Sequence, residues 1–515
     1  MNSLEINGEG LRAVDIFRFV TDSTVKVKLS KSVFASIKSS YEFLASKLRD
    51  TVIYGVNTGL GPMASYLIGK EQLIDLQTNL IRSHATGMGE PLRQDFVFAA
   101  MLVRLNTLSK GYSCVSVELI ERLVLYLNER IAPVIPTHGA VGTSGDLVQL
   151  AHIALAIIGE GEVDYKGKRR QAIDVIKELG IEPYKLKPKE GLALINGTSV
   201  MSGIASILWM HAKNLLNIEI KNSALSLELI QAYNDGISKE LHNLRPHPGQ
   251  IEIAKSLREL LETSQLLRKR DSLNRNNKIT DTVHQISDFV QEVYSFRCTP
   301  QILGPILETV TNSLQVIEIE INSVTDNPVL DREHKEFLHG GNFHGDYIAV
   351  TVDQIKMSLV KLSILSERRI NFFMNQSINK FFPPFLNLNK PGLTLALQGL
   401  QFVATSTTAQ NQSYAFPHSI HSIPTNADNQ DVVSMGTDAS LILDKVVENT
   451  YIVTTIEAVT LAQAVDFLQF QEKLAKSTHE MYNKVREKVA TVIEDRSLTK
   501  ELSALVEYFK SFANG

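Results

Sequence analysis

Cysteine is scarce in this sequence, which has only Cys114 and Cys298 among its 515 residues. The two form no C-x-x-C pair, so the sequence predicts neither a disulfide framework nor a thiolate zinc site. Motifs that mark other common sites are also missing: no Walker A sequence, no G-x-G-x-x-G after a strand and no H-E-x-x-H occurs. These absences argue against the usual nucleotide-binding and zinc-protease sites, and we expect no metal.

The chain also has little net charge and no long apolar run. Its formal net charge of −4 gives no reason to expect nucleic acid as a partner. The opening MNSLEINGEG lacks a basic stretch followed by an apolar one, and no uninterrupted apolar run reaches about 18 residues. We therefore expect a cytoplasmic protein that binds neither nucleic acid nor membrane.

Apolar residues instead recur at helical spacing over long stretches. From Ile306 to Val324 they follow one another at intervals of three and four, until Pro328 stops the helix. The same pattern predicts helices at 198–220, 351–376 and 437–470. Such lengths exceed the usual ~11–12 residues and are typical of a bundle of long helices. Strand signals are few and short, with candidates at 25–30 and 162–167.

Irregular segments rich in glycine and amides lie between the predicted helices. In a helical protein such segments lie on the surface or line a site. They and their neighbours supply tyrosines, amides and one arginine, a set that suits a carboxylate ligand, because arginine pairs bidentately with carboxylate. Each side chain alone also fits a structural role as a core aromatic, a loop-bonding amide or a surface ion pair. The candidates are Tyr54, Asn57, Asn196, Tyr294, Arg297, Gln301, Asn342, His344, Asn426, Asn429 and Gln430.

The segment GTSGD, residues 142–146, has two interpretations. It is not the G-x-S-x-G nucleophile elbow, because glycine follows the serine directly. Taken alone it favours a helix cap, in which Ser144 or Asp146 accepts amide hydrogens from a helix beginning at Leu147. The alternative is reactive chemistry at the serine.

Eight motifs occur in a characteristic order along the chain: YGVNTGLGPMA, NLIRSHATG, GTSGDL, LINGT, YSFRCTPQ, TDNPV, GGNFHG and HSIPTNADNQDVVSMG. In this order they resemble the histidine, phenylalanine and tyrosine ammonia-lyases and the related aminomutases. The resemblance implies a mainly α fold, a long-helix bundle of the ammonia-lyase (fumarase/aspartase-like) type with a smaller mixed N-terminal domain. On this basis we expect an N-terminal domain at 1–190, followed at 191–515 by the central bundle and C-terminal helices.

The resemblance further implies a prosthetic group made from the chain itself. In this family a serine-centred tripeptide cyclises into 4-methylidene-imidazole-5-one (MIO), and the matching residues are Thr143, Ser144 and Gly145. The Gly145 nitrogen would attack the Thr143 carbonyl, and water loss would turn Ser144 into an exocyclic methylene. Only glycine leaves that nitrogen unhindered in so tight a bend. Thr143 replaces the usual alanine, but its side chain stays outside the ring, and Asp146 is expected to hold the bent conformation.

Other roles carry over residue by residue. The resemblance implies that Tyr54 removes the β-proton, that Asn196 lies against MIO and that Tyr294 lies near the reacting groups. Arg297, with Asn327, would bind the substrate carboxylate. The residues expected around the substrate are Ser83, His84, Gln291, Phe343, Gln410, Asn426, Asn429 and Gln430. Family members are homotetramers with each site built from three subunits, so we expect an isolated monomer to be inactive.

The ring-side residues leave the substrate open among polar aromatic amino acids. The pair Ser83-His84 matches histidine lyases and also some bacterial tyrosine lyases, in which the histidine can hydrogen-bond a phenol. Gln410 stands where histidine lyases place a glutamate against the imidazole, and an amide forfeits that charge. We therefore favour L-tyrosine, giving p-coumarate, over L-histidine, giving urocanate. An MIO aminomutase and a catalytically silent scaffold, in which Thr143 blocks ring formation, are the alternatives.

Overall fold

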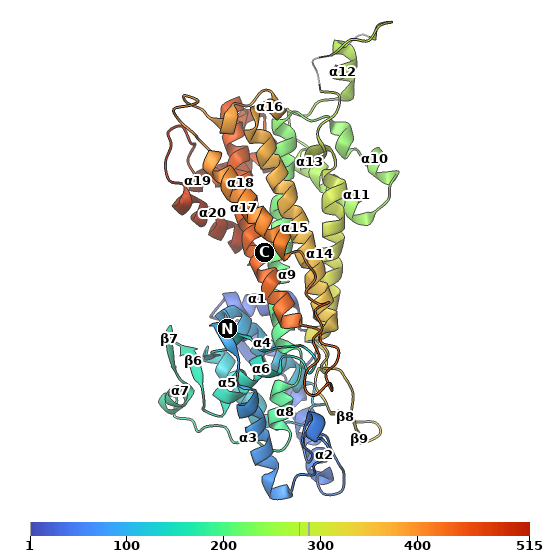
Figure 1. Cartoon of the computed structure of the whole chain (residues 1–515), viewed down its shortest axis with the longest axis vertical. Coiled ribbons are helices and arrows are strands. Elements are labelled where there is room, and N and C mark those ends of the chain that lie inside the picture. The colour runs from blue at the N-terminus through green and yellow to red at the C-terminus, as the bar shows by residue number, and fades with distance from the viewer. Residues whose placement is uncertain (1, 278, 287–288, 515) are drawn as a thin grey trace. The chain divides into compact units, whose positions relative to one another are not determined.

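Four long helices dominate the computed structural model, which describes residues 2–277, 279–286 and 289–514 (Figure 1). They are α9 (Ser199–Leu229), α14 (Thr299–Ile321), α15 (Asp346–Met374) and α18 (Gly436–Leu468). Each covers or exceeds most of a stretch predicted from apolar spacing, so the mainly α, long-helix fold is confirmed. Helix α14 begins earlier than predicted, at Thr299, and accommodates Pro305 in its second turn.

Contacts divide the chain into two units, each made of three separate segments. Unit 1 comprises Met1–Met210, Ser313–Asp353 and Pro417–Leu443, and unit 2 comprises His211–Asn312, Gln354–Phe416 and Asp444–Gly515. The predicted boundary at residue 190 differs from this division. Its physical reason is tertiary pairing, because Gly197 forms a β-bridge with Gly145 and so draws the start of α9 into unit 1.

Unit 1 is built around α4 (Gln94–Ser109), whose residues from Phe96 to Ser109 are all buried. A helix that is covered on every side needs no polar face, and α4 accordingly has apolar residues all round. Its other helices are α1 (Ala13–Thr21), α2 (Lys31–Lys47), α3 (Leu73–His84), α5 (Val117–Asn128), α6 (Leu147–Ile157), α7 (Ala172–Glu178) and α8 (Glu190–Ile195).

The strands of the described chain form small sheets in unit 1. They are β1 (Ser3–Ile6), β2 (Lys26–Leu29), β3 (Met88–Pro91), β4 (Ala132–Pro133), β5 (Pro136–His138), β6 (Glu162–Tyr165), β7 (Lys168–Gln171), β8 (Val329–Asp331) and β9 (Glu336–Leu338). β1 pairs with β2 in parallel, whereas β3–β5, β4–β6–β7 and β8–β9 pair antiparallel. The predicted strands at 25–30 and 162–167 are confirmed as β2 and β6, and the turn after β6 has positive φ at Lys166 and Gly167.

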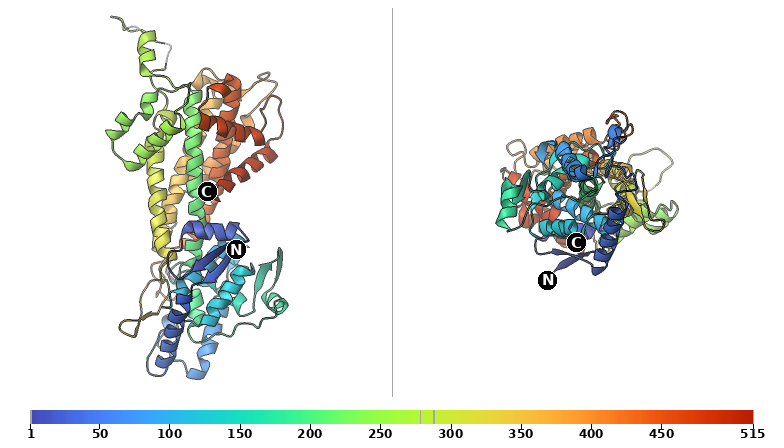
Figure 2. Two further views of the ribbon diagram at one scale, coloured as in Figure 1. Left: turned by 180° about the vertical axis from the view of Figure 1, so that it is seen from behind. Right: turned by 90° about the horizontal axis from the view of Figure 1, so that it is seen from below.

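In unit 2 the long helices run side by side, as Figure 1 and the rear view in Figure 2 both show. Polar side chains tie them together: Asn222 of α9 donates to the Thr454 carbonyl of α18 (3.1 Å), and Arg369 of α15 donates to Thr299 of α14 (2.8 Å). The remaining helices are α10 (Lys239–Asn243), α11 (Pro248–Leu260), α12 (Arg270–Asn276), α13 (Tyr294–Arg297), α16 (Gln376–Asn379), α17 (Gln398–Tyr414), α19 (Lys476–Lys488) and α20 (Thr499–Ser511).

Helix α18 is the one helix among the described residues that is long and apolar enough to cross a membrane. Within the protein, 78% of that apolar stretch is buried. It also carries fully buried polar side chains, among them Glu457 and Gln463. Such burial is typical of a core helix, which is apolar for the same reason that a spanning helix is.

Candidate active site

The tripeptide Thr143-Ser144-Gly145 lies in the loop between β5 and α6, where it pairs with the loop after α8. The Gly197 carbonyl accepts from the Asp146 amide (2.8 Å), and the Gly197 amide donates to the Ser144 carbonyl (3.3 Å). Gly145 has a φ of +70°, and a Cβ at this position would lie 2.0 Å from the Gly197 oxygen. Glycine is therefore required at 145 both by the backbone conformation and by the approach of a second backbone.

The tripeptide is held by Gln430, which binds two of its side chains, and by Asn196, which binds its backbone. The Gln430 amide nitrogen donates to the Ser144 hydroxyl (2.9 Å), and its amide oxygen accepts from the Thr143 hydroxyl (2.6 Å). Asn196 donates to the Ser144 carbonyl (3.2 Å). The threonine that replaces the usual alanine thus anchors Gln430, and the serine hydroxyl is fixed at a defined place.

Asp146 binds a different helix from the one that the cap interpretation predicted. It occupies the N-cap position of α6 but makes no side-chain cap bond there, and neither does Ser144. Its carboxylate accepts instead from the Val200 and Met201 amides (2.8 and 3.0 Å) at the start of α9, and from the Thr437 hydroxyl at the start of α18. The cap interpretation for α6 was therefore wrong: Asp146 joins the tripeptide loop to the first turns of two long helices.

Complete burial raises the pKa of Asp146 to about 6, above its ordinary value of 3.8, although its hydrogen-bond donors oppose the shift. Between these two pH values the folded chain retains a proton that the unfolded chain has released. Lowering the pH through 6 should therefore stabilise the wild type relative to Asp146→Asn, which takes up no proton at this position. Between pH 7 and pH 4 we expect the difference in unfolding free energy to move by up to about 3 kcal/mol in favour of the wild type.

Urea unfolding of both proteins at one protein concentration and several pH values measures this difference. Every other carboxyl group titrates in both proteins, so its contribution cancels. A difference that stays constant from pH 7 to pH 4 would contradict the raised pKa of Asp146.

A cavity of about 1040 Å³ opens beside the tripeptide within unit 1. The site residues predicted from sequence that line it are Tyr54, Ser83, His84, Ser144, Gly145, Asn196, Asn327, Phe343, Asn426, Asn429 and Gln430. Apolar side chains such as Leu60, Leu80 and Val148 complete the wall. Among the described residues that line it, none is an aspartate, glutamate, lysine or arginine. The cavity thus offers amides and hydroxyls, and its polarity suits an uncharged polar ring.

Tyr54 is positioned by the loop that it begins. Its hydroxyl oxygen accepts from the Gly61 amide (2.9 Å), and a β-bridge between Thr58 and Leu67 closes the loop. Asn57, a candidate for ligand binding, has a structural role here: its side chain accepts from the Ile53 amide (2.7 Å) and donates to the Thr51 carbonyl. The phenol is therefore held by a loop that its own hydrogen bonds stabilise.

His84 ends α3 and lines the cavity. Its Nδ1 lies 2.9 Å from the Leu80 carbonyl oxygen and 3.1 Å from the Ser83 hydroxyl. Because a carbonyl only accepts, Nδ1 carries the proton, which leaves Nε2 of the neutral ring as an acceptor. An acceptor at this place can receive a phenol O–H or an imidazole N–H.

Five of the residues that the resemblance placed in the site do not line the cavity, and neither do the further candidates Asn57, Gln301, Asn342 and His344. Of the five, Thr143 lies next to Ser144, which does, whereas the other four lie in unit 2. Gln291 is exposed, and Gln410 is exposed and accepts from Asn449 (2.9 Å). Tyr294 is 68% exposed, and the Arg297 guanidinium lies 5.0 Å from its ring centroid. Arg297 Nε is buried without a hydrogen-bond partner, and among the described residues no carboxylate pairs with this side chain.

Sequence reasoning missed Gly197 and Thr437. Gly197 has no room for a side chain, since a Cβ would lie 2.2 Å from Arg104 Nη1 and 2.8 Å from the Thr325 carbonyl oxygen. Its place in the LINGT motif, directly after Asn196, is the one signal that could have indicated it. Thr437 follows a motif rich in amides, and nothing in its local sequence points to Asp146.

These features define a class of protein: mainly helical enzymes with a polar cavity built beside a serine–glycine loop. Residues 11–487 match the family described as aromatic amino acid lyase. Histidine ammonia-lyase of Geobacillus thermodenitrificans is 37% identical over 508 residues, 99% of this chain and 97% of that protein. The chain belongs to the aromatic amino acid lyase family and is a carbon–nitrogen lyase of the ammonia-lyase type, as predicted.

Solved structures show the same relationship. The tyrosine aminomutase of Streptomyces globisporus has a TM-score of 0.95 at 35% identity, covering 99% of this chain and 97% of that chain. The phenylalanine aminomutase of Pantoea agglomerans has a TM-score of 0.95 at 33% identity, with 99% of both chains covered. The predicted fold class and family are therefore confirmed.

Proposed function

We propose that this lyase eliminates ammonia from a polar aromatic L-amino acid with the help of MIO formed from Thr143, Ser144 and Gly145. The observation that carries the proposal is the setting of the tripeptide: Gly145 has no room for a side chain, and Gln430 and Asn196 hold Ser144 at the cavity wall. Cyclisation joins the Gly145 nitrogen to the Thr143 carbonyl carbon. It releases two waters, one with that carbonyl oxygen and one with the Ser144 hydroxyl. The residues present fit the group.

MIO supplies an electrophile that turns the substrate amine into a better leaving group. We assign removal of the β-proton to Tyr54, which lines the same cavity as Ser144. The Gly61 amide donates to the Tyr54 oxygen and stabilises negative charge there when the proton is lost. Asn196 and Gln430 keep the tripeptide in place, so the geometry of the reaction does not depend on a mobile group.

The substrate carboxylate needs a cation that the cavity of one chain does not provide. Arg297 has no carboxylate partner among the described residues, and a guanidinium is the natural bidentate partner of a carboxylate. We therefore assign the carboxylate to Arg297 contributed by another copy of the chain, with Asn327 at the cavity wall. A homotetramer with shared sites satisfies this requirement.

L-tyrosine is the substrate that we propose first, with L-histidine as the alternative. The acceptor Nε2 of His84 serves a phenol O–H as well as an imidazole N–H, but no carboxylate among the described lining residues is present to pair with a cationic imidazole. L-histidine is supported by the curated relatives, which are named histidine ammonia-lyases and are 36–39% identical to this chain. The structural neighbours named tyrosine and phenylalanine aminomutases are about as similar, so identity does not decide between these activities.

A substrate panel tests the proposal. Purified protein is incubated with L-tyrosine, L-histidine and L-phenylalanine, and arylacrylate and ammonia are quantified together with any β-amino acid. We expect p-coumarate from tyrosine, with Ser144→Ala as the inactive control. Urocanate as the sole product would show that the substrate is histidine and not tyrosine. A β-amino acid as the main product would indicate an aminomutase. No product from any substrate, with an intact mass that lacks the loss of two waters, would leave only the silent scaffold.

A further inference from the structure

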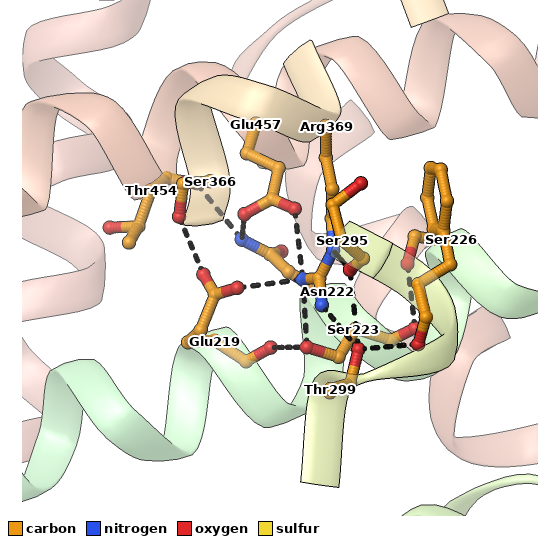
Figure 3. Close-up of polar contacts among 11 residues, drawn as sticks. Glu219, Asn222, Ser223, Ser226, Ser295, Thr299, Ser366, Arg369, Thr454 and Glu457 are labelled. Atoms are coloured by element: carbon orange, nitrogen blue, oxygen red, sulfur yellow. Dashed lines mark hydrogen bonds and ion pairs between the residues drawn. The ribbon is translucent and has the colours of Figure 1, made fainter. Parts of the chain in front are cut away.

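Three charged side chains meet in the helical core of unit 2 (Figure 3). Glu219 of α9, Arg369 of α15 and Glu457 of α18 are each fully buried. Arg369 Nη1 lies 2.7 Å from Glu219 Oε1 and 3.3 Å from Glu457 Oε1. Two carboxyl groups therefore share one guanidinium at a place that water does not reach.

The buried setting also affects the ionisation of Glu219. Burial and the neighbouring Glu457 raise the pKa of Glu219 well above its ordinary value, although Arg369 opposes the shift. Ser366 donates to Glu219 (2.7 Å) and Asn222 to Glu457 (3.1 Å). Each carboxyl group thus has a further hydrogen-bond donor besides Arg369, which is the cation of the group.

The other side of the Arg369 guanidinium binds the segment that carries the proposed substrate residues. Its Nε donates to the Ser295 carbonyl (2.8 Å), and its Nη2 donates to the Thr299 hydroxyl (2.8 Å). Thr299 in turn donates to the Phe296 carbonyl (2.8 Å). The carbonyls of Ser295 and Phe296 belong to α13, whose ends are Tyr294 and Arg297.

Helix α13 needs such support because it is only four residues long. One turn of helix does not hold itself together in water. Its inner anchor is Phe296, which packs edge-on against Phe372 (4.9 Å between centroids) and Phe373 (5.9 Å) of α15. A buried aromatic side chain fixes how close the helix lies to the core. Directed hydrogen bonds to the carbonyls also fix the rotation of the helix about its axis.

We infer that Arg369 is a positioning residue that orients α13 and thereby sets the direction in which Arg297 and Tyr294 face the substrate. The inference rests on the proposed function, which assigns the substrate carboxylate to Arg297. A buried ion group is a poor source of stability compared with apolar packing, so its use here is understandable as a device that fixes geometry. The two glutamates pair with Nη1 of Arg369, while its Nε and Nη2 donors remain aimed at α13 and Thr299.

The test is a double-mutant cycle between Arg369 and Arg297, read by binding of the tetrameric enzyme to two probes. One probe, p-coumarate, has a carboxylate; the other, 4-vinylphenol, is the same molecule without it. If the substrate panel shows that histidine is the substrate, the two probes become urocanate and 4-vinylimidazole. We expect Arg297→Met and Arg369→Met each to weaken p-coumarate binding by about 10- to 100-fold. We expect the double variant to bind no worse than Arg297→Met alone, and all variants to bind 4-vinylphenol as the wild type does.

The outcomes separate the inference from the proposed function. If Arg297→Met leaves p-coumarate binding unchanged, the carboxylate assignment and the inference both fall. If Arg297→Met weakens binding but Arg369→Met does not, or the two losses add, Arg297 keeps its role and the positioning role of Arg369 is overturned. Equal losses for both probes would likewise overturn it, since they would indicate general damage to the fold.

Two further variants guard against misfolding. Thr299→Val removes the hydroxyl between Arg369 and α13 but leaves every charge in place. It takes the place of Arg369→Met if that variant does not fold, and we expect it to show the same selective loss of p-coumarate binding. Arg486→Met is the matched control, because it removes another largely buried guanidinium of unit 2 that pairs with Asp466 (2.8 Å) and donates to the Val489 carbonyl. We expect it to lower stability without selective loss of p-coumarate binding.

Discussion

Gly145→Ala is expected to abolish cyclisation of the tripeptide and to lower ammonia release by a factor of about 10³ or more, the scale seen when a catalytic unit is removed. An alanine Cβ would lie 2.0 Å from the Gly197 oxygen, and the backbone at 145 has a positive φ that alanine adopts poorly. To relieve the overlap, the pairing between the two loops must open. The Gly145 nitrogen then loses its fixed place relative to the Thr143 carbonyl.

Intact mass measures the result directly, because the cyclised chain is lighter by two waters. The near-ultraviolet difference spectrum against Ser144→Ala gives a second measure that does not depend on turnover. Gly399→Ala is the matched control, since a Cβ there meets nothing within 4 Å. A Gly145→Ala protein that still loses two waters would show that the approach of Gly197 does not govern ring formation.

The long helices were predictable because their information is local. Apolar residues at intervals of three and four from Ile306 to Val324 require only that one face be buried, whatever covers it. The strands β2 and β6 were found for the same reason, from short β-prone stretches bounded by turn residues. The start of α14 was missed because the prediction followed the apolar spacing only from Ile306. The helix extends back past Pro305, since a proline near the beginning of a helix forfeits few hydrogen bonds.

The contacts of the site were not predictable, because they join residues that are distant in sequence. Gln430 lies 287 residues after Thr143, and Thr437 lies 291 residues after Asp146. A polar segment shows by its composition that it lies on the surface or lines a cavity, but its partner depends on how several helices pack. The cap interpretation of Asp146 failed for this reason: the adjacent helix α6 offered local amides, yet α9 and α18 provide the donors.

Buried charge is the other feature that sequence hides. Arg369 stands in SERRIN, a stretch that would ordinarily be assigned to an exposed helix face, yet it is fully buried between two glutamates. Nothing local distinguishes it from its neighbour Arg368, whose side chain is 59% exposed. Only the three-dimensional arrangement indicates which of the two arginines reaches α13.

Mixing two inactive variants should restore activity, if each site draws on more than one chain. Tyr54→Phe removes the proposed base and is expected to lower kcat by about 10²- to 10⁴-fold. Arg297→Met removes the proposed carboxylate partner, which is not among the residues lining the cavity. In a mixed tetramer, a Tyr54 from one variant can meet an Arg297 from the other, and that site has both groups. With equal amounts and random assembly, about one site in four is complete.

Coexpression with two different tags and purification over both isolates the mixed tetramers, and their activity is compared with that of each variant alone. We expect recovery towards about a quarter of the wild-type kcat, whereas each variant alone stays near its own background. The double variant Tyr54→Phe/Arg297→Met, mixed with itself, controls for the tagging. If the mixture has no more activity than its parents, Tyr54 and Arg297 act within one chain, and the shared site is disproved. Recovery would establish that the missing cation reaches the cavity from a neighbouring copy, because no chain in the mixture carries both residues.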